Sequence, residues 1–385
     1  MEKENKQKGV LILSPFFLPN TGGVETHLSD LVSYLSKNGW NVSVITYKPL
    51  TTRVSATFKE KQGDNVLIYR IPWFGKTLFH KFEKYPLLQF FYLTPGLLLF
   101  AFFFLLKNKK KYKIIHAHGF AASFVANILS RFFKVRLVSS MHAIYGFGGG
   151  YLTTVCRWIL SRFDKVFCLA EPSRQDLLKA GLPSSLLDIY VQWVDKDNFK
   201  IVDKNSARIK LGLPDKFTVL FLGRLIEKKG AKVLLEVAKS LDKINFVFVG
   251  DGPLENEFLK EGGVYKNVLI VGRKSPKEAA DYYGSCDVFV LPSQYEEGFA
   301  RVVIETLYSG RPIISANKGC LPYMINNSVG FLVDPTAENI KEKILYLYNN
   351  RAEIERLTGN CRNYAMKKFG EENAQHIIDS YLPRE

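Results

Sequence analysis

The stretch FTVLFLGRLIEKKG, residues 217–230, decides the fold of the second half of the chain. Its first six residues are β-favouring and almost all apolar, which is typical of a strand buried on both faces of a parallel sheet. Gly223 ends this run, and a basic loop follows before the next helical pattern. Open α/β sheets bind ligands where their parallel strands end, so Arg224 and Lys229 can converge on a diphosphate there. The alternative is that both cations are surface charges.

Similar runs alternate with helical patterns along the whole chain, and the series begins twice, near Val10 and near Phe217. We expect strands at 9–14, 41–47, 65–71, 113–119, 136–142, 165–170, 217–223, 245–251, 268–272, 288–293 and 312–316. We expect helices at 24–38, 121–133, 151–163, 230–242, 277–285, 300–309 and 338–349. Alternation of this kind predicts an α/β protein with two Rossmann-like, doubly wound domains that face each other across a cleft. A polar stretch, roughly 195–215, separates the two series.

Composition narrows the classes of function. The net charge of +16 is uneven, because residues 1–195 contain 25 Lys and Arg against 12 Asp and Glu. Basic surfaces favour nucleic acids, anionic lipids or phosphorylated ligands, and no nucleic-acid-binding motif accompanies this charge. The five cysteines form no CxxC pair, which indicates buried thiols in a reducing compartment. The polar start MEKENKQK leads us to expect no signal peptide.

The segment 86–113, PLLQFFYLTPGLLLFAFFFLLKNKKKYK, contains an apolar stretch about as long as a membrane span. Expected strands precede and follow it, and a single crossing would place them on opposite sides of a bilayer. We therefore predict an interfacial helix or re-entrant hairpin on an anionic membrane surface, with Lys107, Lys109, Lys110 and Lys111 on the headgroups. Plain buried helices and a true span are the alternatives.

The stretch EEGFARVVIE, residues 296–305, places two carboxylates around an expected helix start. Gly298 favours a turn, so Glu297 is expected in a loop and Glu305 about one turn inside the helix. Helix N-termini attract anions, which suits a ligand with phosphates in the middle and hydroxyl groups at both ends. An ordinary solvated helix with two surface acids is the alternative.

Two places in the first half are candidate binding positions. Gly22 and Gly23 follow the first expected strand, where backbone can approach a ligand, although a plain turn and helix cap would use them equally. His116 and His118 end another strand on the same face, and His142 ends the next. Each histidine can hold a hydroxyl group or a developing charge, or can be a hydrogen-bonded structural residue. The pair Asp195 and Asp197 is a weak metal signal, and we expect no metal site.

Taken in order, GGVE, HAHG, GRLIEKKG, GDGP and EEGFARVVIE resemble the family 4-like glycosyltransferases of the GT-B fold. The resemblance covers about residues 9–365, and its most specific motifs are Arg-x4-Lys and Glu-x7-Glu in the second half. It implies an N-terminal domain of residues 1–195 that faces acceptor and membrane, a nucleotide-sugar-binding domain of residues 196–365, and a C-terminal helix, 366–385, that crosses back to the first domain. It also implies a nucleotide-diphosphate sugar, with UDP or GDP, as donor.

The resemblance implies roles for individual residues. Arg224 and Lys229 would hold the diphosphate, Glu305 the ribose hydroxyls, and Glu297 the transferred sugar. The remaining residues assigned to the donor are Gly22, Gly23, Arg273, Gly298, Phe299 and Ala300. His118 matches the histidine of the active site, which makes His118, Glu297, Arg224 and Lys229 the catalytic candidates, and His142 is the candidate on the acceptor side.

The sequence departs from the family pattern at three places. The interdomain segment reads Gln192-Trp193-Val194-Asp195, where Asn-Gly-Val-Asp is usual. Tyr323 replaces the acid of the usual Gly-Gly-x-Pro-Glu, and Ala300 stands where a larger or hydroxyl residue is common. These changes leave the diphosphate motif intact and affect the sugar and acceptor side.

The resemblance therefore implies a retaining, metal-independent glycosyltransferase of the hexosyltransferase type, with no cofactor. It would be peripheral on the cytoplasmic face of a membrane and act on a lipid-linked or lipid acceptor. A soluble acceptor is the milder alternative, and a nucleotide-sugar epimerase of the same fold is another. The missing GxGxxG motif argues against an NAD-dependent oxidoreductase, and the retained charged residues argue against a catalytically silent scaffold.

Overall fold

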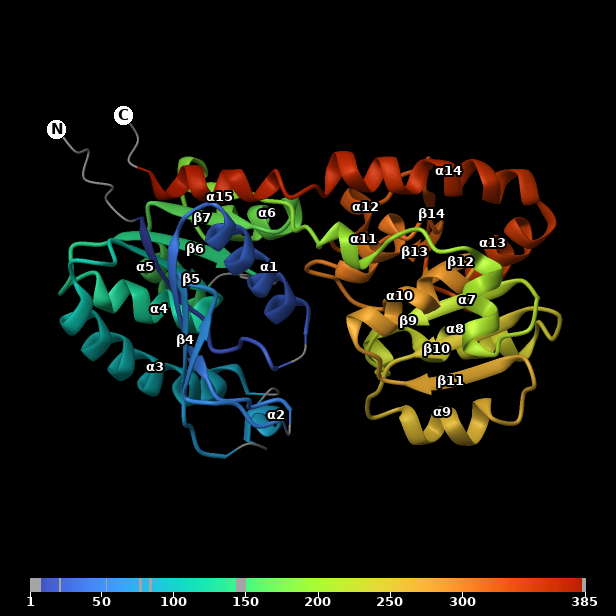
Figure 1. Ribbon diagram of the computed structural model, residues 1–385, viewed down its shortest axis with the longest axis horizontal. Helices are drawn as coiled ribbons and strands as arrows, with labels where there is room; N and C mark the ends of the chain where they lie inside the picture. Colours follow the sequence, from blue (N-terminus) through green and yellow to red (C-terminus); the bar gives the residue numbers. More distant parts are fainter. Residues whose placement is uncertain are drawn as a thin grey trace. The chain divides into compact units, whose positions relative to one another are not determined.

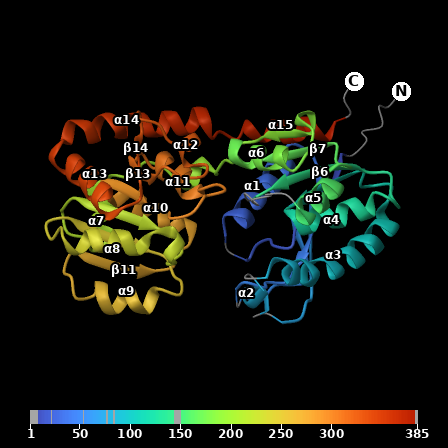
Figure 2. The ribbon, with the colours of Figure 1, turned by 180° about the vertical axis from the view of Figure 1, so that it is seen from behind.

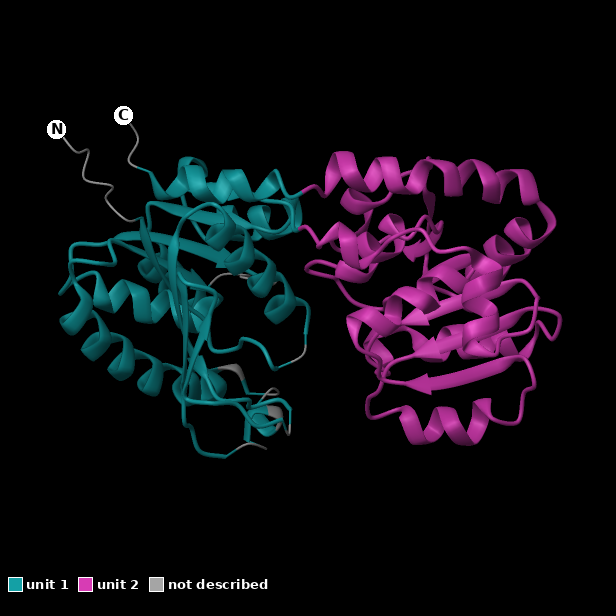
Figure 3. Ribbon diagram, viewed as in Figure 1, with its two compact units in different colours: residues 1–192, 371–385 teal, residues 193–370 magenta. Residues whose placement is uncertain are grey.

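The computed structural model of the protein describes residues 8–20, 22–52, 54–75, 78–82, 85–142 and 150–382. Most of the start MEKENKQK and the glycine-rich stretch after His142, residues 143–149, lie outside the described residues. The chain divides into two compact units (Figure 3). Unit 1 comprises residues 1–192 and 371–385, and unit 2 comprises residues 193–370. The boundaries predicted from the sequence are 195 and 365.

Unit 1 is built on an eight-stranded sheet in the order β3-β4-β2-β1-β5-β6-β7-β8. All neighbouring pairs are parallel except β3 and β4. The strands are β1 (Gly9–Leu13), β2 (Asn41–Tyr47), β3 (Lys59–Gln62), β4 (Val66–Ile71), β5 (Ile114–His118), β6 (Arg136–Met141), β7 (Lys165–Cys168) and β8 (Leu187–Ile189). On one side of β1 lie β2, β4 and the edge strand β3, and the chain then returns to the other side of β1 with β5 to β8. The carboxyl ends of β1 and β5 therefore flank a topological switch point, where α/β sheets bind ligands.

The helices of unit 1 are α1 (Gly23–Lys37), α2 (Leu78–Phe82), α3 (Pro86–Asn108), α4 (Phe120–Leu129), α5 (Tyr151–Leu160), α6 (Glu171–Lys179), the 3-10 turn η1 (Ser184–Leu186) and α15 (Asn373–Tyr381). Helix α3 packs beside α4, and α4 packs beside α5. Both opposite views show these three helices on one side of the unit 1 sheet (Figures 1 and 2). Helix α15 contacts α1 and β6, so the end of the chain belongs to unit 1.

Unit 2 repeats the plan with six parallel strands in the order β11-β10-β9-β12-β13-β14. They are β9 (Thr218–Leu222), β10 (Asn245–Val249), β11 (Val268–Gly272), β12 (Val288–Leu291), β13 (Ile313–Ala316) and β14 (Gly330–Val333). Its helices are η2 (Lys196–Asn198), α7 (Lys204–Leu211), η3 (Glu227–Lys229), α8 (Ala231–Lys239), α9 (Glu255–Gly262), α10 (Pro276–Ser285), α11 (Arg301–Tyr308), α12 (Leu321–Met324), α13 (Ala337–Asn349) and α14 (Arg351–Lys368). The strand order reverses between β9 and β12, which is the switch point of this unit.

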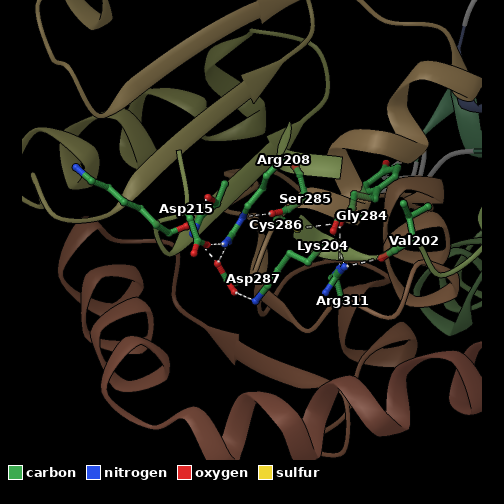
Figure 4. A network of polar contacts seen from close by, with 12 residues as sticks. Val202, Lys204, Arg208, Asp215, Gly284, Ser285, Cys286, Asp287 and Arg311 are labelled. Carbon is green, nitrogen blue, oxygen red and sulfur yellow. Dashed lines mark hydrogen bonds and ion pairs between the residues drawn. The ribbon is translucent and has the colours of Figure 1, made fainter. Parts of the chain in front are cut away.

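A buried polar network attaches α7 to the sheet of unit 2 (Figure 4). The Asp287 carboxylate accepts hydrogen bonds from Lys204 Nζ at 2.6 Å, Arg208 Nη2 at 2.6 Å and the Thr218 backbone N–H at 2.7 Å. Arg208 also donates to Asp215 at 2.6 Å. The Asp287 and Arg208 side chains are 3% and 6% exposed, so this is a buried charge pair whose groups are all hydrogen-bonded.

The predicted fold class is confirmed: two doubly wound α/β units with largely parallel sheets. The strands β3, β8 and β14 and the helices α2, α6, α7, α9, α12 and α14 are absent from the sequence prediction. The stretch predicted as a polar connection, roughly 195–215, contains α7, whose buried side chains are Ala207 and Arg208. The hairpin alternative for 86–113 is wrong, because α3 continues as one helix through Pro95.

Candidate active site

The site in unit 2 is built where two loops meet at the switch point between β9 and β12. These strands are adjacent, with Val219 opposite Val288 and Leu220 opposite Phe289. The loop after β9 contains Arg224 and Lys229, and the loop after β12 contains Glu297. Because both loops leave the carboxyl ends of neighbouring parallel strands, residues 68 positions apart in the chain come into direct contact.

Lys229 and Glu297 form the centre of this site. Lys229 Nζ lies 2.7 Å from Oε1 and 2.9 Å from Oε2 of Glu297. Ser293 Oγ donates to Oε1 at 2.5 Å, and Tyr295 Oη donates to Oε2 at 2.8 Å. A carboxylate has about four acceptor positions, so protein groups occupy all of them here. Glu297 thus fixes Lys229 in place, and the predicted contact between Glu297 and the donor sugar remains a prediction.

Two glycines allow this close approach. Gly230 has φ +73°, and a Cβ there would lie 1.8 Å from the Pro292 carbonyl oxygen. Gly319 has φ +58°, and a Cβ there would lie 2.4 Å from the Glu297 backbone. The left-handed conformation and the lack of space both favour glycine at each position. Gly230 therefore allows the loop of Lys229 to pack against Pro292, and Gly319 allows its own loop to pack against the backbone of Glu297.

Arg224 and Arg273, the other cations predicted to bind the donor, are more exposed than Lys229. Arg224 is exposed and, among the described residues, makes no ion pair. Its charge also lowers the pKa of Tyr295, although burial raises that pKa more strongly. Arg273 Nε donates to Asp251 in the GDGP loop at 2.9 Å, and its side chain is half exposed. This loop supports the Arg224 loop, because the Leu225 N–H donates to the Asp251 carbonyl at 2.8 Å.

Glu305 lies on α11, just beyond the helix start that Gly298, Phe299 and Ala300 lead into. Tyr283 Oη donates to its Oε2 at 2.8 Å, and Arg301 Nε lies 4.0 Å from Oε1. Burial raises the pKa of Glu305, while Arg301 and Tyr283 lower it. The carboxylate has acceptor capacity left on Oε1, which suits a pair of ligand hydroxyl groups.

In unit 1, Gly22 is the N-cap of α1 and Gly23 is its first residue. The Glu25 carboxylate folds back beside Gly22, so that a Cβ on Gly22 would lie 2.4 Å from Glu25 Oε2. Burial raises the pKa of Glu25. A phosphate that approached this helix start would meet the Glu25 carboxylate, which the sequence prediction did not consider.

The histidines of unit 1 form one buried cluster at the ends of β5 and β6. His118 Nδ1 lies 3.0 Å from His142 Nε2, and the two rings are stacked. His116 Nδ1 bonds with Tyr381 Oη of α15 at 2.6 Å, and His116 Nε2 bonds with Ser140 Oγ at 2.8 Å. His116 therefore has structural partners on both nitrogens. His118 and His142 each keep one buried nitrogen without a hydrogen-bond partner among the described residues.

Sequence reasoning missed Ser293 and Tyr295 as parts of the site. Ser293, Tyr295 and Glu297 follow β12 at every second position. The chain bends at 294 and 295, so simple strand alternation would not have found them, and their place in the loop that leaves β12 is the signal that the sequence offers. Of the residues at the departures from the family pattern, Tyr323 is exposed, and Arg301 donates to the Trp193 carbonyl at 2.9 Å within unit 2.

Comparison with known proteins agrees with this geometry. Residues 203–368 match the family described as Glycosyl transferases group 1, and residues 21–196 match Glycosyltransferase Family 4. The Phosphatidylinositol N-acetylglucosaminyltransferase GPI3 subunit of Saccharomyces cerevisiae is 22% identical over 350 residues, covering 85% of this chain and 72% of the relative. The uncharacterized glycosyltransferase MJ1178 of Methanocaldococcus jannaschii is 27% identical over 383 residues, covering 93% of both.

Among solved structures, sucrose-phosphate synthase from Thermosynechococcus elongatus has a similar fold. Its TM-score is 0.82 at 21% identity, covering 97% of this chain and 98% of that chain. Two family matches cover the two units in the expected order, and a whole-chain structural match joins them. The chain is a family 4-like glycosyltransferase with the GT-B fold.

Proposed function

We propose that this glycosyltransferase moves a hexose from a UDP- or GDP-sugar to a lipid or lipid-linked acceptor. It does so with retention of anomeric configuration, without a metal, on the cytoplasmic surface of a membrane. The observation that supports the donor site most strongly is the Lys229–Glu297 pair at the switch point of unit 2. The observation that supports the membrane surface is the apolar outer face of α3.

The donor chemistry follows from the groups at the switch point. When the sugar leaves, negative charge develops on the diphosphate, and preorganised cations and N–H groups stabilise that charge. Lys229 is held by a carboxylate, so its direction is fixed, while Arg224 is exposed and makes no ion pair within the part of the chain that the structure describes. Helix α11 begins at Arg301, four residues after Glu297, and the first N–H groups of a helix have no partner within the helix. Such groups can perform the role that a divalent cation has in other transferases, so we expect full transfer in the presence of EDTA.

The outer face of α3 is apolar from Leu87 to Leu106. Leu88, Phe91, Leu99, Phe103 and Leu106 are 49–66% exposed, while the opposite side of the helix, including Leu97 and Leu105, is buried against the sheet. A surface helix of a soluble domain has polar residues on its outer face. Inserting these half-exposed side chains into lipid is favourable by about 1 kcal/mol each.

The membrane contact is peripheral in this proposal. Helix α3 is long and apolar enough to cross a membrane by length and composition, and one third of its most apolar window is buried. However, β4 precedes α3, β5 follows it, and both strands belong to the same sheet. A crossing would separate these strands, which supports a position of α3 along the surface rather than across the membrane. The exposed residues Lys107, Lys109, Lys110 and Lys111 then face anionic headgroups, at about 1 kcal/mol per cation.

The acceptor is proposed by combining this face with the comparison. The yeast relative is named a phosphatidylinositol N-acetylglucosaminyltransferase subunit. Phosphatidylinositol is an anionic lipid, so it suits both the apolar face and the basic half of the chain. A soluble acceptor would leave the outer face of α3 without a role.

The test uses purified protein, radiolabelled UDP- and GDP-sugars, and vesicles with or without phosphatidylinositol and total membrane lipid. We expect label from one donor to enter the organic phase only when lipid acceptor is present. Label transferred only to water-soluble sugars would contradict the lipid acceptor. Conversion of the donor sugar without any acceptor would indicate an epimerase. Hydride exchange with NAD would contradict the transferase altogether.

A further inference from the structure

His118 and His142 are joined by one hydrogen bond that links their protonation patterns. The distance between His118 Nδ1 and His142 Nε2 is 3.0 Å. One proton lies between the two atoms, so one ring must donate and the other must accept. His118 Nε2 and His142 Nδ1 are both buried without a partner among the described residues. If both rings are neutral, one of these two outer nitrogens is a donor and the other is an acceptor.

Both rings are neutral near pH 7. Burial lowers the pKa of His142 to about 4, and burial together with His116, His142 and His27 lowers the pKa of His118 well below its usual range. The titratable groups around the pair are His116 on β5, His27 on α1, and Tyr190, whose Oη bonds His27 Nε2 at 3.1 Å. Among the described residues, no carboxylate bonds to His118 or His142, so nothing nearby favours an imidazolium.

Only two arrangements of the pair are then possible. In the first, His142 Nε2–H donates to His118 Nδ1, and both rings carry their proton on Nε2. In the second, His118 Nδ1–H donates to His142 Nε2, and both rings carry their proton on Nδ1. An isolated imidazole side chain prefers the Nε2–H tautomer, and this preference counts twice in favour of the first arrangement. The hydrogen bond of one nitrogen sets the state of the other.

We propose that His142 is a positioning residue: it donates Nε2–H to His118 Nδ1 and thereby makes His118 Nε2 a hydrogen-bond donor for a ligand oxygen at the carboxyl end of β5. That His118 Nε2 donates to a ligand, rather than accepts from it, rests on the proposed function. A sugar hydroxyl group can donate or accept, but the oxygens of a leaving diphosphate are acceptors only, and negative charge grows on them during transfer. An Nε2–H stabilises an oxygen that gains negative charge, whereas a lone pair in its place would be repulsive.

The first measurement is the tautomer of His118, which does not depend on activity. The chain has six histidines, so ¹⁵N-histidine labelling gives a small number of ring signals, assigned with His118→Gln and His142→Gln. We expect the His118 and His142 rings to carry their protons on Nε2, both in free protein and with nucleoside diphosphate. A proton on His118 Nδ1, or a charged His118 ring at pH 7, would overturn the inference even if the chain transfers sugar as proposed.

The second measurement separates positioning from packing. His142→Met fills a similar volume without a donor, and His142→Gln retains an N–H near the original Nε2. We expect kcat to fall roughly fivefold to tenfold in His142→Met, the range that one hydrogen bond supplies, and to recover in His142→Gln. The Kd for the nucleoside diphosphate alone should not change. In a His118→Gln background, His142→Met should cost nothing further, because the effect passes through His118.

These experiments also distinguish the inference from the proposed function. If no sugar is transferred by any variant but both rings carry Nε2–H, the proposed function fails and the link between the rings stands. If transfer occurs and His142→Met has full activity, the proposed function stands and the role of His142 is wrong. If His142→Met lowers kcat equally in the wild-type protein and in the His118→Gln variant, the role of His142 is purely structural, and the inference is wrong.

Discussion

At the scale of single residues, the site of unit 2 depends on one charge pair with an unusual number of partners. Glu297 is 2% exposed, and four hydrogen bonds from three side chains end on its carboxylate. A buried carboxylate in this position is costly unless its acceptors are satisfied. The geometry therefore preorganises Lys229 before any ligand arrives, which is how a site stabilises charge that appears only in the transition state.

Lys229→Ala removes the fixed cation, and we expect the Kd for UDP or GDP to rise about tenfold or more, since a charge-assisted hydrogen bond is worth about 1.5–3 kcal/mol. Isothermal titration calorimetry measures the affinity. Lys228→Ala is the matched control, because the Lys228 side chain is exposed and one residue away. Equal effects of both substitutions would show that only general positive charge matters.

Glu305→Ala removes the carboxylate proposed to hold the ribose hydroxyls. We expect weaker nucleotide binding by roughly tenfold, with little change in affinity for pyrophosphate, which has no ribose. Glu338→Ala is the control, because Glu338 is an exposed acid in the first turn of another helix, α13. If Glu305→Ala weakens the binding of pyrophosphate as much as that of the nucleotide, Glu305 does not bind the ribose.

At the scale of elements, the two functional surfaces of the chain come from a loop pair and from one helix. The prediction from sequence was accurate where the pattern is local, as in β1, β2, β9 and β10, whose apolar runs end at the observed strand ends to within two residues. It failed for α7, because Arg208 is buried by a partner that is distant in the chain, Asp287. From the sequence alone, a charged residue is expected to be solvent-exposed, because its buried partner is not known.

Asp287→Ala tests the network of Figure 4. It leaves Arg208 buried with part of its hydrogen bonding lost, so we expect the free energy of unfolding of unit 2 to fall by about 3 kcal/mol. Urea unfolding with a probe in unit 2 measures this change. Asp215→Ala is the matched control, because it removes the other carboxylate of Arg208, which is 87% exposed, and should cost about 1 kcal/mol or less.

Leu99→Glu with Phe103→Glu tests the outer face of α3. Both side chains are 60% exposed, so the substitutions leave the core intact. Charges on this face are repelled by anionic headgroups and costly in lipid, so we expect binding to anionic vesicles in a sedimentation assay to fall by at least tenfold. Val264→Glu, at a position 76% exposed in unit 2, is the control. Unchanged sedimentation of the double variant would exclude α3 as the membrane contact.

At the scale of the whole molecule, both units place candidate residues at the switch point of a doubly wound sheet. The sequence allowed this much to be predicted, because strand ends and charged loops are visible in it. It did not show that Lys229 and Glu297 touch, or that His118 and His142 share a proton, since both contacts arise from strand order rather than from spacing. The hydrogen bond between His116 and Tyr381 of α15 joins residues 265 positions apart, and the sequence did not predict it either.

The buried histidines predict how stability depends on pH. Burial lowers the folded-state pKa of His116 to about 3, against about 6.5 when unfolded. Below pH 6.5 the unfolded chain binds a proton that the folded chain does not, so stability falls as pH decreases. His116→Gln should reduce this slope by up to about 1.4 kcal/mol per pH unit between pH 6 and 4. Urea unfolding midpoints measured from pH 8 to 4 give this slope. If stability depends on pH equally in the wild-type protein and in His116→Gln, the prediction is wrong.

The central claim is that unit 2 binds a nucleoside diphosphate sugar at the Lys229 and Glu297 loops. Calorimetric titration of the purified protein with UDP, GDP, ADP and NAD tests it most directly. We predict binding of UDP or GDP with a clear preference for one of them, weakened by Lys229→Ala, and no binding of NAD. Binding of NAD, or of none of the four, would contradict the claim.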